Sequence, residues 1–259
     1  MSEQTQNSTS AVTRSCYPSV PESIMTASRC ELTDIKLQTL HGTIPDDLQG
    51  HVFIVAPVGS VNSGDFPSPD GTSILDGDGM IYRLDFDKKG EVGLKTRLVK
   101  PPCYYADKAS RPETKYAKYG FRNYGITRFS LYLGIRNELN TAFLPMKFRD
   151  ESNWRLLVTY DAGRPYEIDT QTLEVRTPVG ANIEWRLRCA PVSGSETSLQ
   201  LPFQPVLSTA HPAFDAHTSE MFTVNYGRSL SNFLESVPFI YDIDELPEQV
   251  DEFIEAIAS

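Results

Sequence analysis

From about residue 36 onward the chain consists of short apolar runs, many of them alternating with polar residues and most of them ended by glycine or proline. GHVFIVAPVG, at 50–59, is a compact apolar run that predicts a strand. Within 76–100, MIYRLDFD alternates with a period of two, KKGE is typical of a turn, and VGLKTRLVK returns. This pattern predicts a β-hairpin.

The same pattern recurs later in the chain. Residues 155–180 contain three apolar runs separated by turn-forming residues, which predicts three strands, and 220–227 predicts one more. Between them, 101–150 is rich in aromatic and basic residues without a regular period, and we expect irregular structure there. Many short strands and almost no helix indicate an all-β architecture, for which a sandwich, a barrel and a propeller all qualify.

The two ends of the chain have a different character. Residues 1–30 are rich in Ser, Thr and Gln without periodicity, which predicts a disordered or loosely attached tail over 1–35. The C-terminal residues predict a short amphipathic helix over 245–257. Its apolar face would consist of Leu246, Val250, Phe253, Ile254 and Ile257. We therefore expect a tail followed by one β domain over 36–259.

Composition and charge exclude some functions. Hydrophobic residues make up 40% of the 259 residues and charged residues 22%, as in globular proteins. The net charge of −10 counts against a nucleic-acid partner, which needs clustered Lys and Arg. The sequence has neither a membrane-spanning apolar run nor the apolar core of a signal peptide, so we expect a cytoplasmic protein. The cysteines form no C-x-x-C pair and are expected to be free thiols. They are Cys16, Cys30, Cys103 and Cys189.

Two kinds of motif need comment. ILDGDGM, at 74–80, alternates acids and glycines as a calcium loop does, but it lacks the third acid and the distal Glu. We interpret it as a tight glycine turn that leads into the hairpin. The sequence contains no G-x-S-x-G motif and no G-x-G-x-x-G motif after a strand, so no residue pattern supports a hydrolase or a dinucleotide enzyme.

The histidines are the main candidates for chemistry. His211 and His217 lie six positions apart in LSTAHPAFDAHTSEMFTVNYG, with a proline between them, so they cannot share a helix face. His211 is expected at a strand end or a sharp turn, where its ring could be held as a metal ligand. His217 is expected to be a solvated turn residue, and His41 and His51 to be surface or capping residues.

Four segments together resemble the carotenoid cleavage oxygenases, in the order and near the spacing of that family. They are LHGTIPDDLQGHVFIVAPVG, LDGDGMIYRLDF, RLLVTYDAGRPYEIDTQTLEV and STAHPAFDAHTSEMFTVNYG. The resemblance implies a seven-bladed β-propeller with Fe(II) on its axis, held by four histidines from four blades. It implies that His211, in the AHP motif, is the first of these ligands. Four neutral imidazoles leave open positions on iron for O2.

The resemblance also assigns further roles. Asp161, in YDAGRP, stands where the family has a Glu that orients a ligand from behind. Asp is one methylene shorter than Glu. The implied reaction is oxidative scission of a conjugated C=C bond of a carotenoid or apocarotenoid by O2, with Phe, Tyr and Leu side chains of 121–148 lining the polyene route. From its own pattern, segment 125–137, which has apolar residues between Arg128 and Arg136, is expected to lie near a membrane-facing substrate entrance or, alternatively, to be an ordinary buried strand.

The length of the chain limits this interpretation. A propeller blade takes about 40–50 residues, so residues 36–259 would supply about five blades and not seven. We therefore expect the N-terminal part of such an enzyme. Two other functions remain open: an inactive propeller remnant that binds a lipid or a protein, and a small all-β domain that holds zinc through His211, His217 and Asp215.

Overall fold

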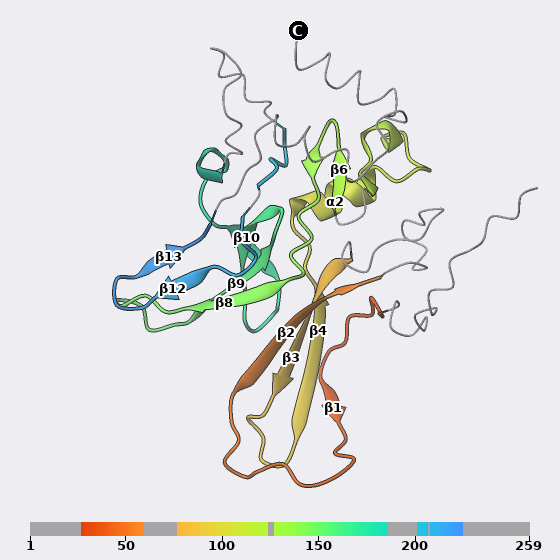
Figure 1. The fold of residues 1–259 in the computed structure, drawn as a ribbon. Coiled ribbons are helices and arrows are strands. Elements are labelled where there is room, and N and C mark those ends of the chain that lie inside the picture. The colour runs from red at the N-terminus through yellow and green to blue at the C-terminus, as the bar shows by residue number, and fades with distance from the viewer. Residues whose placement is uncertain (1–26, 60–76, 124–126, 186–200, 207, 225–259) are drawn as a thin grey trace, which may run out of the picture.

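The computed structural model describes residues 27–59, 77–123, 127–185, 201–206 and 208–224 (Figure 1). Their strands form antiparallel sheets of four, four, three and two strands. The mostly β class that the sequence predicts is thus confirmed. Each four-stranded sheet has the size of a propeller blade, although the described residues do not close into a ring of blades.

The first sheet has the strand order β1-β4-β3-β2. Strand β2 (His51–Val58) pairs with β3 (Asp78–Asp85), and β3 pairs with β4 (Val92–Leu98), all antiparallel. The short β1 (Ile35–Leu37) covers the other edge of β4. These strands confirm the strand expected within 50–59 and the hairpin expected within 76–100.

The second sheet has the order β11-β10-β9-β8. It consists of β8 (Ala142–Met146), β9 (Arg155–Tyr160), β10 (Gly163–Ile168) and β11 (Val175–Pro178). The three strands predicted within 155–180 are therefore present. The register between β9 and β10 shifts between Gly163 and Tyr166, so the turn at residue 161 is not a regular hairpin end.

The main hydrophobic core joins the two four-stranded sheets. Ile81 and Val99, from the first sheet and its exit, pack with Val158 and Ile168 of the second, and all four are at most 2% exposed. Leu139, which is 0% exposed, belongs to the same cluster. Burying each such side chain contributes about 1.5–3 kcal/mol, so this core fixes the position of one sheet against the other.

The expectation of irregular structure throughout 101–150 is wrong in part, because this region contains a helix and a small sheet. Helix α2 (Pro102–Ala109) begins at prolines, which the first turn tolerates, and ends at Ser110, whose N–H donates to the Ala106 carbonyl at 3.0 Å. A one-turn 3-10 helix, η2 (Ala117–Tyr119), follows. The three-stranded sheet consists of β5 (Arg122–Asn123), β6 (Arg128–Ser130) and β7 (Gly134–Ile135).

The ends of the described chain complete the fold. After the 3-10 helix η3 (Asn182–Trp185), β12 (Ala213–Asp215) and β13 (Glu220–Phe222) form a hairpin, and β13 confirms the strand expected within 220–227. Within the expected tail, residues 27–35 contact the first sheet, where the Leu32 N–H donates to Thr96 Oγ1 at 2.7 Å. The helix expected over 245–257 lies outside the described residues.

Candidate functional site

His211 stands at the point where a buried segment reaches the surface. Ser208 and Ala210 are each 1% exposed, whereas His211, one residue later, is exposed just before β12. The His211 N–H donates to Thr209 Oγ1 at 3.1 Å. The backbone that leads to His211 is thus packed in the interior, while His211 itself is exposed.

Two residues at the end of β9 hold this segment through its backbone. Asp161 Oδ1 accepts the Ala210 N–H at 3.2 Å, and the Asp161 carbonyl accepts the Ser208 N–H at 3.0 Å. Thr159, which is 0% exposed, donates its hydroxyl proton to the Ala210 carbonyl, at an O···O distance of 2.5 Å. Both polar groups of Ala210 are therefore fixed to the second sheet, and with them the Cα position of His211.

The resemblance implies that Asp161 orients a neighbouring ligand, and the structure places Asp161 beside the His211 segment. The hydrogen bond that it shows is with the Ala210 N–H and not with an imidazole. Asp161 therefore orients the candidate ligand through its backbone. Thr159 was not predicted, because a threonine inside the apolar strand RLLVTY looks like an ordinary strand residue.

The structure gives the other three histidines different surroundings from those of His211. His217 is exposed in the β12–β13 turn, and its N–H donates to Asp215 Oδ1 at 2.7 Å. This hydrogen bond is the main cause of the lowered pKa of Asp215. His51 Nδ1 lies 2.6 Å from Asp85 Oδ1 on the first sheet, and His41 is exposed.

No group of three or more His, Cys, Asp or Glu side chains in the described ranges is arranged to hold a metal ion. The zinc alternative with His211, His217 and Asp215 is therefore not supported there. For the iron that the resemblance implies, the same residues offer one imidazole, His211. By themselves they do not fit a ferrous ion, which needs several preorganised ligands.

Arg128 and Arg136 are not at the surface, and the expectation that they flank a membrane contact is wrong. They are 5% and 0% exposed. Arg136 forms ion pairs with Asp78 and, at 3.1 Å, with Asp107, while Arg128 also pairs with Asp107. Arg29 Nη2 lies 2.8 Å from Asp78 Oδ2. These residues form a buried charge network that ties helix α2 and β6 to the first sheet.

This network gives the DGDG motif its role. Asp78 supplies a buried carboxylate, and Gly79 lets the chain pass close to residues 138–140: a Cβ atom at Gly79 would lie 2.1 Å from the Leu139 carbonyl oxygen. The Gly79 N–H donates to the Glu138 carbonyl at 2.9 Å. Asp78, Gly79 and Met80 are the first residues of β3, so they form the start of a strand and not the tight turn that was expected, while residues 74–76 lie outside the described residues.

Several of the Phe, Tyr and Leu side chains of 121–148 that were expected along a polyene route lie in or against the core. Leu139 belongs to the main cluster, against which Phe129 and Phe143 pack, and Leu144 belongs to a smaller one. Among the described residues of this range, the exposed large apolar side chains are Leu131 and Tyr132, at 53% and 57%. None of the described helices is both long enough and apolar enough to cross a membrane.

Comparison with known proteins gives consistent matches. A family model described as retinal pigment epithelial membrane protein matches residues 25–244. Isoeugenol monooxygenase of Pseudomonas putida is 26% identical over 204 residues, which are 78% of this chain and 36% of that protein.

Solved structures agree on the fold. A variant of Synechocystis apocarotenoid oxygenase superimposes with a TM-score of 0.50 and 22% identity, over 80% of this chain and 39% of that chain. A second variant of the same enzyme gives a TM-score of 0.49 and 21% identity over the same shares. The present chain therefore spans about two fifths of the length of these proteins or slightly less.

Proposed function

Since the chain belongs to the carotenoid cleavage oxygenase family, we propose that it forms part of a dioxygenase of the kind that this family contains. The reaction is the oxidative scission of a conjugated C=C bond of a carotenoid or apocarotenoid. One O2 is consumed, and each alkene carbon leaves as a carbonyl group. In this proposal the iron, when bound, supplies the activation of O2, and a seven-bladed propeller completes the fold around it.

The observation that carries this proposal is the way in which the His211 segment is held. Asp161 and Thr159 fix the N–H and the carbonyl of Ala210, one residue before the imidazole. A metal ligand must be positioned before the metal arrives, because a mobile side chain binds weakly. His211 is the candidate iron ligand of this part of the protein, and Asp161 and Thr159 are its positioning residues.

The purified chain is expected to hold well under one iron per molecule, because a single imidazole cannot retain Fe(II) against water. The measurement is elemental analysis after anaerobic loading with Fe(II) and desalting. Stoichiometric iron that survives desalting would contradict this expectation, because it would require a set of ligands that the described residues do not provide.

The role of His211 is best tested where the other ligands are present. A chimera would carry residues 27–224 in place of the matching part of Synechocystis apocarotenoid oxygenase. We expect about one iron per chimera, and its loss in the His211→Ala variant. His217→Ala, six positions away in the same hairpin region, is the matched control and should keep the iron. A folded chimera without iron, or a His211→Ala chimera that retains it, would refute the proposal.

Isoeugenol monooxygenase, as a relative, favours a second class of substrate. Isoeugenol carries a short alkene conjugated to a phenolic ring, so the same scission would give an aromatic aldehyde and a short one. Supplying the chimera with an apocarotenal and with isoeugenol, and identifying the aldehydes formed, distinguishes the two classes. The alternative of an inactive, binding-only remnant predicts no product from either.

We also propose that the tip of the β6–β7 hairpin contacts a membrane surface. Leu131 and Tyr132 are exposed there, Tyr132 stacks edge-on against Tyr119 at 5.2 Å, and Lys118 lies over the Tyr119 ring. Apolar and aromatic side chains next to a lysine suit the interface of an anionic bilayer.

The double variant Leu131→Ser/Tyr132→Ser should sediment less with anionic lipid vesicles than the wild type does, because it removes the apolar surface that would enter the bilayer. Leu40→Ser removes a leucine that is 84% exposed outside this hairpin and serves as the control. If the wild type and the double variant sediment to the same extent, the hairpin tip is not the contact.

A further inference from the structure

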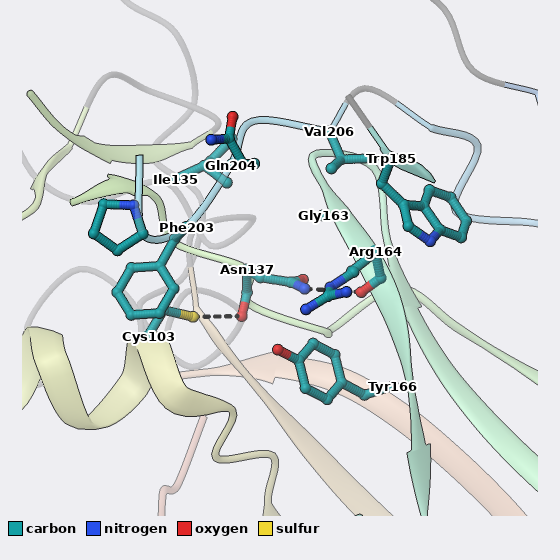
Figure 2. Close-up of a pocket in the computed structure, with 11 residues that line it drawn as sticks. Cys103, Ile135, Asn137, Gly163, Arg164, Tyr166, Trp185, Phe203, Gln204 and Val206 are labelled. Atoms are coloured by element: carbon teal, nitrogen blue, oxygen red, sulfur yellow. Dashed lines mark hydrogen bonds between the residues drawn. The ribbon is translucent and has the colours of Figure 1, made fainter. Parts of the chain in front are cut away.

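A small cavity lies between helix α2, strand β10 and the segment 201–206, and its volume is about 40 Å³ (Figure 2). Its polar wall is formed mainly by Cys103, Asn137 and Tyr166, and its apolar wall by Ile135, Trp185 and Phe203. His211 does not line it. The cavity is thus a second feature of the molecule, independent of the proposed iron ligand.

The Asn137 amide carries an unused acceptor in this wall. Its Nδ2 donates to the Arg164 carbonyl at 2.8 Å, which fixes which end of the amide is the oxygen. Asn137 is 7% exposed, and its Oδ1 has no hydrogen-bond partner among the described residues. Gly163 makes room for this amide, because a Cβ atom there would lie 2.3 Å from Oδ1. A buried acceptor without a donor is costly, so the site favours a ligand that supplies one.

Tyr166 offers the complementary group. Its hydroxyl points toward Asn137 and Arg164 (Figure 2). A tyrosine hydroxyl is both a donor and an acceptor, so it can give its proton to a ligand that lies beside Asn137. Burial raises the pKa of Tyr166, which keeps this proton in place at neutral pH.

The two groups together select a hydroxyl. A ligand must donate to Asn137 Oδ1 and accept from the Tyr166 hydroxyl, and an alcohol does both with one oxygen. A carboxylate would face the Asn137 oxygen without a proton to offer, and a cation would lie near the Arg164 guanidinium. A water molecule requires about 10–15 Å³ of such space, so the cavity has room for about three non-hydrogen atoms.

We propose that this cavity is a binding site for a short-chain alcohol. The hydroxyl bridges Asn137 and Tyr166, and the alkyl group lies against the apolar wall formed by Ile135, Trp185 and Phe203. Neither group needs to ionise for this, and no iron is involved. The site would therefore be present in the chain as it stands.

Ethanol is the probe, and the side-chain amide resonance of Asn137 in the full chain is the readout. The limit on affinity per ligand atom sets Kd at about 1 mM or weaker for three atoms. We expect a saturable shift in this range. Acetonitrile has the same number of non-hydrogen atoms but no donor, and it should bind at least about tenfold more weakly. Tyr166→Phe, which keeps the ring, should weaken ethanol binding by about tenfold.

Tyr116 is 47% exposed and does not line the cavity, so Tyr116→Phe is the control that should leave ethanol binding unchanged. Val206→Ile adds a methylene group to the cavity wall and should exclude ethanol without touching either polar group. A shift that grows linearly without saturation would mean that the cavity holds water only, and it would overturn the proposal. Equal binding of acetonitrile, or of acetate, would overturn the assignment to alcohols.

Discussion

Arg136→Met should lower the free energy of unfolding by about 3–5 kcal/mol, the usual cost of removing one partner from a buried ion pair. Arg136 is 0% exposed and pairs with both Asp78 and Asp107, which are 6% and 3% exposed. Methionine fills much of the volume but leaves the two carboxylates with fewer positive charges. Urea unfolding monitored by circular dichroism gives the measurement.

Arg155→Met is the matched control, because Arg155 also forms two ion pairs, with Glu151 at 2.6 Å and Glu167 at 3.0 Å. Its side chain is 42% exposed, so water replaces much of what is lost and the cost should be about 1 kcal/mol or less. Equal destabilisation by the two substitutions would show that burial does not increase the contribution of the Arg136 ion pairs to the free energy of unfolding.

The pH dependence gives the network a second test. Burial raises the pKa of Asp78, but the charges of Arg136, Arg29 and Arg128 outweigh it, so the pKa lies below its ordinary value. A lowered pKa stabilises the wild type fully above about pH 4, and this stabilisation is lost as the pH falls further. In Arg136→Met the pKa of Asp78 rises relative to the wild type. The deficit in stability should therefore be smaller at about pH 4 than at about pH 7, and an equal deficit at both would contradict this account.

Gly134→Ala should lower the free energy of unfolding by about 3 kcal/mol, from backbone strain and lost hydrogen bonds together. Gly134 has φ +96°, and a Cβ atom there would lie 1.9 Å from the Phe203 carbonyl oxygen. That oxygen accepts the Ile135 N–H at 2.9 Å, and the Phe203 N–H donates to the Leu133 carbonyl at 2.8 Å. The alanine methyl group would push segment 201–206 away and break both bonds.

Gly90→Ala is the control that introduces the backbone strain of a positive φ without a steric contact. Gly90 has φ +71° in the β3–β4 turn, but a Cβ atom there would meet no atom within 4 Å. It should therefore cost only about 1 kcal/mol, measured by the same urea unfolding. If the two alanine variants were equally stable, the close approach of residue 134 to Phe203 would not contribute to the free energy of unfolding.

Local patterns were enough to predict the strands within 50–59, 76–100, 155–180 and 220–227, but not β5 to β8 within 101–150. The hairpin of β3 and β4 follows from the alternation in MIYRLDFD and the KKGE turn after it, so neighbouring residues supply all of the information. Helix α2 was missed because it has only eight residues, too few for a clear apolar face. Its buried Asp107 is held by Arg136, 29 residues further along the chain, and such a partner cannot be read from the local pattern.

The same distinction applies to the candidate site. His211 was identified from the resemblance and from its position beside a proline, and it remains a proposed ligand. Thr159 acts on a carbonyl 51 residues away, so nothing near it in the sequence marks its role. Arg128 and Arg136 were placed at the surface because charged residues usually lie there. Ion pairs with Asp78 and Asp107 allow both arginines to be buried, and only the fold shows that these carboxylates lie beside them.

The position of Asp78 also has a consequence for synthesis on the ribosome. All four strands of the first sheet lie within residues 35–98, so they can pair before the rest of the chain is made. Arg29 is already present to pair with Asp78, but Arg136 and Glu138, which contact Asp78 and Gly79, are made later. At about 5–20 residues per second, this leaves an interval of a few seconds. During it the nascent sheet is formed while the Asp78 carboxylate still lacks the charge of Arg136. The synthesis of residues 136–138, and not the pairing of the strands, completes the surroundings of Asp78 in the first sheet.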